Sequence, residues 1–182
     1  MIYSIGLIEL NSIASGIEVA DIMLKTAEVE LVFAGTICPG KYAALVTGEV
    51  AAVENSVQTG LKTGGEMVVD HFVLAMVHEA VIPALSGTSK VERLQALGVI
   101  ETFSIASSIV AADTAAKAAA VELIEIRLGT GIGGKSFVTM TGEVAAVQAA
   151  VDAGTVSVRE KGMLVYKTVI PSPDPKLGKA LL

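Results

Sequence analysis

The chain has 182 residues, a net charge of −6 and one cysteine, and 52% of its residues are hydrophobic although only 4% are aromatic. The acidic balance gives no electrostatic reason to expect nucleic acid. A single cysteine cannot form an intrachain disulfide, which fits a reducing compartment. No uncharged apolar run approaches the ~20 residues of a membrane span, and the first ten residues lack a basic stretch, so we expect no signal peptide. We therefore expect a cytoplasmic protein that binds neither nucleic acid nor membrane.

The sequence carries the same pattern twice. The heptapeptide at residues 47–53 returns unchanged at 141–147, and shorter matches upstream keep an offset of 92 residues. The offset becomes 94 by position 40, so the second copy gains two residues in the loop that holds Cys38 in the first copy. A repeat of this length indicates a duplicated domain rather than a solenoid unit. We predict a first domain at residues 1–86, a linker at 87–91 and a second domain at 92–182.

The first copy predicts four strands and two helices in the order β-α-β-β-α-β. The predicted strands are residues 2–10, 29–34, 42–46 and 67–76, and residues 35–40 are predicted as a loop. Apolar residues recur at helical spacing after Ser12, a suitable N-cap, and again before the glycine pair at 64–65. The predicted buried stripes are Ile13, Ile17, Ala20 and Leu24, then Val50, Val53, Val57 and Leu61. This order is that of the split βαβ, ferredoxin-like fold, an α+β arrangement with helices on one face of an antiparallel sheet.

The second copy repeats this order. Its predicted stripes are Ile105, Ile109, Ala112 and Ala116, then Val144, Val147 and Val151, and its hairpin loop is residues 129–134. Three prolines within residues 170–175 predict an extended surface tail. The apolar content exceeds what two modest cores need, and we interpret the surplus as surface buried between subunits, with a well-packed interior as the alternative.

Several motifs make the chain similar to the tandem-domain shell proteins of bacterial microcompartments. They are Gly6-Leu7-Ile8-Glu9, Asp21-x-x-x-Lys25-x-Ala27, Gly48 to Val53, and Val169-Ile170-Pro171. The resemblance covers nearly the whole chain, in both copies, in the direct rather than the permuted element order. It implies two shell domains per chain, a pseudohexameric homotrimer with a central pore, assembly with other shell proteins, and a structural rather than an enzymatic role.

One position departs from the family pattern. Family members often place an arginine between the prolines of the terminal motif, and this position is Ser172 here. In the first copy we take Val81-Ile82-Pro83 as the corresponding stretch, and it also lacks arginine. We therefore expect the contacts at the edges of the tile to differ in detail.

The loop at residues 36–41 most resembles that of the propanediol-utilization tandem shell protein, which carries an iron–sulfur cluster at its centre. The resemblance implies one [4Fe–4S] cluster per trimer, held by Cys38 of three chains, with one iron left open. The implied role is electron transfer or cluster delivery across the shell, with an encapsulated or cytosolic redox protein as partner. The implied pore-lining residues are Thr36, Ile37, Pro39, Gly40, Lys41, Gly131, Ile132, Gly133 and Gly134. Lys41 would favour the thiolate if it points inward.

Other interpretations of these residues stay open. Cys38 could be a small buried hydrophobe, an idle thiol, or a ligand of a Cys₃ zinc site. The tile could conduct metabolites without a cluster, or the chain could be a soluble effector-binding sensor with tandem ferredoxin-like domains. A cysteine enzyme ranks last, because no motif supplies a general base. His71, His78, Glu9 and Glu101 are interpreted as structural.

Lys25 and Lys117 occupy corresponding helix ends in the two copies. Their simplest role is a favourable interaction with the helix dipole. The resemblance implies instead that both lie at the edge of the tile and pack against neighbouring tiles.

Overall fold

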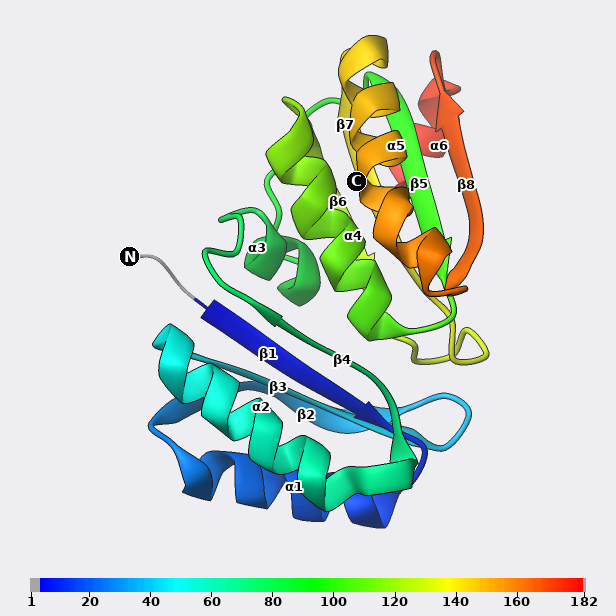
Figure 1. Cartoon of the computed structure of the whole chain (residues 1–182). Coiled ribbons are helices and arrows are strands. Elements are labelled where there is room, and N and C mark those ends of the chain that lie inside the picture. Colours follow the sequence, from blue (N-terminus) through cyan, green and yellow to red (C-terminus); the bar gives the residue numbers. More distant parts are fainter. Residues whose placement is uncertain (1–3, 182) are drawn as a thin grey trace. The chain divides into compact units, whose positions relative to one another are not determined.

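The computed structural model describes residues 4–181 and divides into two compact units (Figure 1). The first unit contains the chain up to Val77 together with Gly129–Gly134, and the second contains His78–Leu128 and the chain from Lys135 onward. The units therefore depart from the repeat at two places. The segment after the last strand of the first copy packs in the second unit, and the hairpin loop of the second copy packs in the first.

The first unit has the predicted α+β architecture, with helices on one face of an antiparallel sheet (Figure 1). Its strands are hydrogen-bonded in the order β2-β3-β1-β4. Its elements are β1 (Ser4–Leu10), α1 (Ile13–Thr26), β2 (Val29–Ile37), β3 (Lys41–Gly48), α2 (Val50–Gly64), a 3₁₀ turn η1 (Gly65–Met67) and β4 (Val68–Leu74). Residues 2 and 3 of the first predicted strand lie outside the described residues.

The core of the first unit lies between the helices and one face of the sheet. Ile8 and Leu10 of β1 are fully buried there, with Val53 and Val57 of α2. Gly6 lies on the same face, and a Cβ on it would stand 2.5 Å from a methyl of Val57. A side chain at position 6 would therefore push the helix off the sheet, which explains a glycine at this position.

The predicted buried stripe of α1 is wrong except at Ala20. The buried residues of this helix are Gly16, Val19, Ala20 and Met23. Ile13, Ile17 and Leu24 are 40%, 55% and 38% exposed. A helical pattern identifies an apolar face but not the surface that covers it, and here the face that carries Ile13 and Ile17 is left exposed.

The second unit repeats the architecture, with strand order β6-β7-β5-β8. Its elements are α3 (Val81–Ser86), β5 (Ala96–Thr102), α4 (Ile105–Ala118), β6 (Glu122–Arg127), β7 (Ser136–Gly142), α5 (Val144–Glu160), β8 (Leu164–Ile170) and α6 (Pro175–Leu181). In contrast to α1, the whole predicted stripe of α4 is buried. Ser104 caps α4 by accepting the Ser107 N–H at 3.0 Å, as Ser12 accepts the Ser15 N–H at 3.3 Å before α1.

The predicted extended tail is wrong beyond residue 174, because Pro175 begins the helix α6. Proline is compatible with the first turn of a helix, where its missing N–H would have no helical partner. The Asp174 side chain accepts the Lys176 N–H at 2.8 Å, and its carbonyl accepts the Gly178 N–H at 3.3 Å. The prolines therefore precede and start a helix rather than excluding one.

The assignment of Val81-Ile82-Pro83 as the counterpart of the terminal motif is also wrong. Ile170, the last residue of β8, pairs with Leu97, and Leu74, the last residue of β4, pairs with the equivalent Ile5. The counterpart of residues 169–171 is therefore residues 73–75, whereas residues 81–83 open α3. No helix within residues 4–181 is both long enough and apolar enough to cross a membrane.

Candidate functional site

Cys38 begins the tight turn that joins β2 to β3. Ile37 and Lys41 form the last pair of the ladder, and the Gly40 N–H donates to the Ile37 carbonyl at 3.1 Å. The predicted loop is therefore too long: residues 35–37 are strand residues, and Ile37 is buried. The glycine and proline are needed only in the turn, and the antiparallel ladder continues up to it.

The glycine-rich loop of the second copy lies against this turn, within the first compact unit. The Cys38 N–H donates to the Gly129 carbonyl at 3.0 Å. The Gly131 N–H points at the sulfur, with 3.4 Å between the nitrogen and Cys38 Sγ. The structure thus brings together two loops that were both predicted to line the pore. Their direct contact was not predicted from the sequence.

Glycine is required in this loop at Gly134, which is buried and has φ +79°. A Cβ on Gly134 would lie 2.4 Å from the Cys38 carbonyl oxygen and 2.7 Å from Cδ of Pro39. Both the backbone conformation and the close approach exclude a side chain. The exposed glycines of the same loop, Gly131 and Gly133, also have positive φ but would meet nothing within 4 Å.

Lys41 contacts a carboxylate rather than standing free beside the turn. Its Nζ lies 2.9 Å from Oε1 of Glu9, which is fully buried. The second copy repeats this pair, with Lys135 Nζ 2.5 Å from Glu101 Oε1 in a more exposed setting. The sequence analysis missed both pairs, although the recurrence of Glu and Lys at matching positions was a signal that could have revealed them.

The donor set of one chain is a single thiol. Cys38 is half-buried, and among residues 4–181 no three His, Cys, Asp or Glu side chains gather closely enough to hold a metal ion. An iron–sulfur cluster here would therefore need the Cys38 sulfur of further chains. The turn suits that use, since the sulfur sits at a hairpin tip and receives a backbone N–H, the kind of contact that surrounds cluster sulfurs.

The two candidate edge lysines lie in the last turns of α1 and α4 and pair within their own helices. Lys25 is bonded to Asp21 at 2.6 Å, and its side chain is 72% exposed. Lys117 is bonded at 2.7 Å to Asp113, which is nearly buried and also accepts the N–H of His78 at 2.8 Å. The equivalent pairs thus differ in burial.

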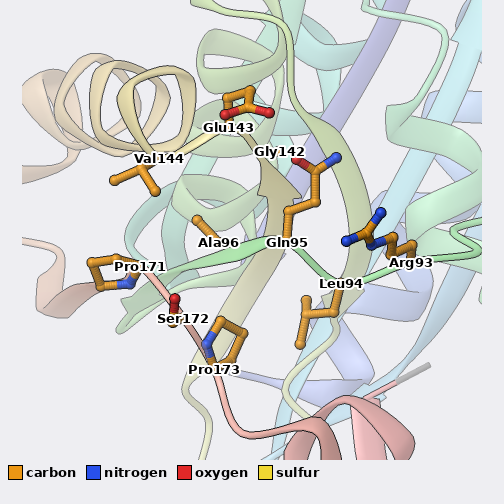
Figure 2. A pocket seen from close by; sticks show the side chains of 10 residues that line it. All are labelled: Arg93, Leu94, Gln95, Ala96, Gly142, Glu143, Val144, Pro171, Ser172 and Pro173. Carbon is orange, nitrogen blue, oxygen red and sulfur yellow. The ribbon is translucent and has the colours of Figure 1, made fainter.

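A separate hollow of about 340 Å³ lies in the second unit, where β5 starts, α5 starts and β8 ends (Figure 2). Pro171, Ser172 and Pro173 form one wall, so the position where the family often has arginine borders this hollow. Its charged lining residues are Arg93 and Glu143. Among the described residues, no hydrogen bond joins the Ser172 hydroxyl to Glu143 or to another base, so the lining does not form a catalytic arrangement.

Comparisons with known proteins agree with this architecture. The family model for the BMC domain matches residues 4–77 and 96–173. The chain is 43% identical over 182 residues to the bacterial microcompartment shell protein PduT of Citrobacter freundii, covering 100% of this chain and 99% of that protein. A crystal structure of a microcompartment protein from Desulfitobacterium hafniense superposes with a TM-score of 0.89 at 55% identity, covering 98% of this chain and 99% of that one.

A fused, permuted hexameric shell protein of the RMM microcompartment shares the fold, with a TM-score of 0.65 at 24% identity over 87% of this chain and 84% of that one. The chain belongs to the BMC-domain family of bacterial microcompartment shell proteins. It is a structural shell protein of the tandem-domain, PduT type, which confirms the resemblance and the α+β fold predicted from the sequence.

Proposed function

We propose that three copies of the chain form a pseudohexameric tile of a cytoplasmic microcompartment shell, and that Cys38 of the three chains binds one [4Fe–4S] cluster at the central pore. The turn at Cys38 and the loop at residues 131–134 line that pore. Neighbouring shell proteins surround the tile, and a redox protein inside or outside the shell exchanges electrons or a cluster with it.

The homotrimer is supported by unequal burial of equivalent positions in the two copies. On the helix side, Ile105 and Ile109 of α4 are fully buried, whereas Ile13 and Ile17 of α1 are exposed. The same helix face is thus buried in the second copy and exposed in the first, although both copies carry apolar residues on it. Ile13, Ile17 and Leu24 are exposed on one face of α1, and apolar residues grouped in this way mark a surface that another subunit can cover.

The sheet side shows the opposite inequality. On the faces turned away from the helices, the paired residues Glu9 and Asp70 of the first unit are buried. Their equivalents are less buried: Glu101 is half-buried and Tyr166 is 67% exposed. One chain therefore exposes two different surfaces, the helix face of the first unit and the sheet face of the second. A head-to-tail ring of identical chains requires two different surfaces on each chain.

The cluster proposal rests on the half-buried sulfur of Cys38 at a turn tip, with the Gly131 N–H directed at it. A threefold axis would supply three such thiolates from one cysteine per chain, and the fourth iron would remain open. Bound there, a [4Fe–4S] cluster would supply one-electron transfer. The turn itself orients the sulfur, and the ammonium of Lys41, three residues further on, is held by Glu9.

Anaerobic purification followed by iron, sulfide and zinc analysis tests the cluster. Four irons and four sulfides per three chains, with brown colour, are expected. Cys38→Ser should remove iron and colour completely rather than by a third, because each site loses all its protein thiolates at once and a hydroxyl is a poor ligand for iron. Zinc in place of iron, or neither metal after reconstitution, would contradict the proposal and favour a metabolite-conducting pore.

A further inference from the structure

The loop Gly129–Gly134 is joined at both ends to strands of the second unit but packs in the first, against the turn that carries the cysteine. It is also the place where the second copy is two residues longer. Two hydrogen bonds and one close approach connect it to Cys38. They are the Cys38 N–H to the Gly129 carbonyl, the Gly131 N–H to the sulfur, and the tight contact of Gly134 with the Cys38 carbonyl.

We infer that the loop Gly129–Gly134 is a positioning element for Cys38, in which Gly134 lets the loop lie on the turn so that the Gly131 N–H is donated to the sulfur. The second copy, which has no cysteine of its own, thereby contributes to the chemistry of the first. The packing part of this inference concerns the free protein. The part that concerns a bound cluster rests on the proposed function.

The consequence for the thiol is a shielded and oriented sulfur. A backbone N–H directed at sulfur restrains the side-chain rotamer, and the loop limits the directions from which a reagent can approach. The consequence for a cluster is electronic. Hydrogen bonds to the sulfurs are one of the factors that set the reduction potential of an iron–sulfur centre, and removing one stabilises the oxidised form.

Two neighbouring glycines provide a matched pair of variants. Gly134→Ala and Gly133→Ala both place a side chain on a backbone with positive φ, +79° and +67° respectively. Only the Cβ at position 134 meets the Cys38 turn, at 2.4 Å from its carbonyl oxygen, whereas the Cβ at position 133 meets nothing within 4 Å. Backbone strain is therefore common to the two variants, and separation of the loop from the turn is specific to G134A.

The first test measures alkylation of Cys38 by iodoacetamide in the full chain, freed of iron and sulfide. G134A should react faster than wild type by about threefold or more, because the loop no longer shields the sulfur. G133A should react at the wild-type rate. Equal rates for G134A and G133A would overturn the inference.

A second test does not depend on the folding of G134A. Hydrogen–deuterium exchange of the peptide covering residues 129–134 is compared between wild type and Cys38→Ala, which removes the acceptor sulfur and keeps the Cys38 N–H. Exchange at Gly131 should accelerate in C38A, because its amide loses its partner. Unchanged exchange at Gly131 would show that the sulfur does not hold the loop.

The cluster-dependent arm uses protein reconstituted with iron and sulfide. The midpoint potential should fall in G134A at unchanged iron content and stay at the wild-type value in G133A. If the wild-type chain binds no iron and sulfide, the proposed function fails, while the alkylation and exchange results still decide the positioning role. If the cluster forms and its potential is the same in both variants, the electronic part of the inference is wrong.

Discussion

At the scale of single residues, the repeated Glu–Lys pair shows how duplication preserves a contact while changing its surroundings. Glu9 is fully buried and its partner Lys41 is nearly so, whereas the side chains of Glu101 and Lys135 are 30% and 43% exposed. A charge pair withdrawn from water depends on both partners, because removing one leaves the other in a medium of low dielectric. A pair near solvent loses little when it is broken.

Lys41→Met should therefore destabilise the protein by about 3 kcal/mol, since the buried Glu9 carboxylate loses its ammonium while its remaining contacts stay in place. The matched change Lys135→Met should cost at most about 1 kcal/mol. Equilibrium unfolding in urea at neutral pH measures both. Similar losses for the two variants would show that burial does not distinguish the pairs.

At the scale of elements, the local sequence pattern predicted which segments form strands and helices. Which face of each helix is buried depended on the tertiary structure. The order β-α-β-β-α-β within each repeat, which omits α3 and α6, follows from alternation and helical spacing, and it was predicted correctly. The buried face of α1 was not, because Ile13 and Ile17 are as apolar as the residues that pack on the sheet. The helix α6 was missed because proline was taken as excluding a helix rather than starting one.

The candidate site was predictable to the same extent. Cys38 and the two loops could be found from composition and the repeat, since a lone cysteine in a segment rich in glycine and proline is conspicuous. The contact between Gly131 and Cys38 joins positions 93 residues apart in sequence. Neither periodicity nor turn chemistry encodes such a contact, because both describe only residues that are close together in the sequence.

The ion pair between α5 and β8 makes the stability of the protein depend on pH. Lys167 of β8 donates to Asp152 of α5, and this bond, with a second from Gln148, holds the pKa of Asp152 below its usual value. A carboxyl whose pKa is lowered on folding stabilises the protein above its unfolded pKa, about 3.9, and this contribution is lost as the pH falls through the folded value.

Lys167→Met should therefore lower stability by less than about 1 kcal/mol at neutral pH, because the Asp152 side chain is 54% exposed and solvent screens the pair. The difference between variant and wild type should shrink as the pH falls below about 4 and disappear once Asp152 is protonated in both states. Thermal unfolding from pH 2 to pH 7 follows this difference. A difference in stability between variant and wild type that stays constant from pH 4 to pH 2 would show that Asp152 is not stabilised by Lys167.

At the scale of the whole molecule, the exposed stripe of α1 should decide the oligomeric state. Ile17→Glu places a carboxylate where the proposed neighbour packs, and burying an unpaired charge is strongly unfavourable. The variant should elute as a folded monomer at micromolar concentration, with wild-type circular dichroism. Light scattering coupled to gel filtration makes the measurement.

The control for this prediction is Val156→Glu. Val156 lies on α5 and is 56% exposed, as Ile17 is 55% exposed on α1, so the two variants add the same charge at equal exposure. V156E should remain trimeric. A trimer in both variants, or a wild-type chain that is monomeric, would remove the proposed ring.

Lateral assembly of trimers should depend on Lys25 and Lys117. A long lysine can pack its stem on a neighbour while its ammonium bonds across the seam. The double change to alanine should keep the trimer and abolish sheets or tubes seen by electron microscopy. Lys62→Ala with Lys176→Ala removes the same two charges elsewhere and should leave sheets intact, whereas sheets that persist without Lys25 and Lys117 would exclude the edge role.

Each compact unit contains a segment encoded by the other repeat, and this arrangement restricts how the duplicated gene can evolve. A gene divided at residues 87–91 would leave the first half without Gly129–Gly134, and the second half without His78–Ser86. We expect each separated half to be less stable than its unit in the intact chain, because it lacks a segment that packs in that unit. Fusion of the two copies has thus become hard to reverse, and mutations at Gly134 are constrained by a cysteine that belongs to a different repeat.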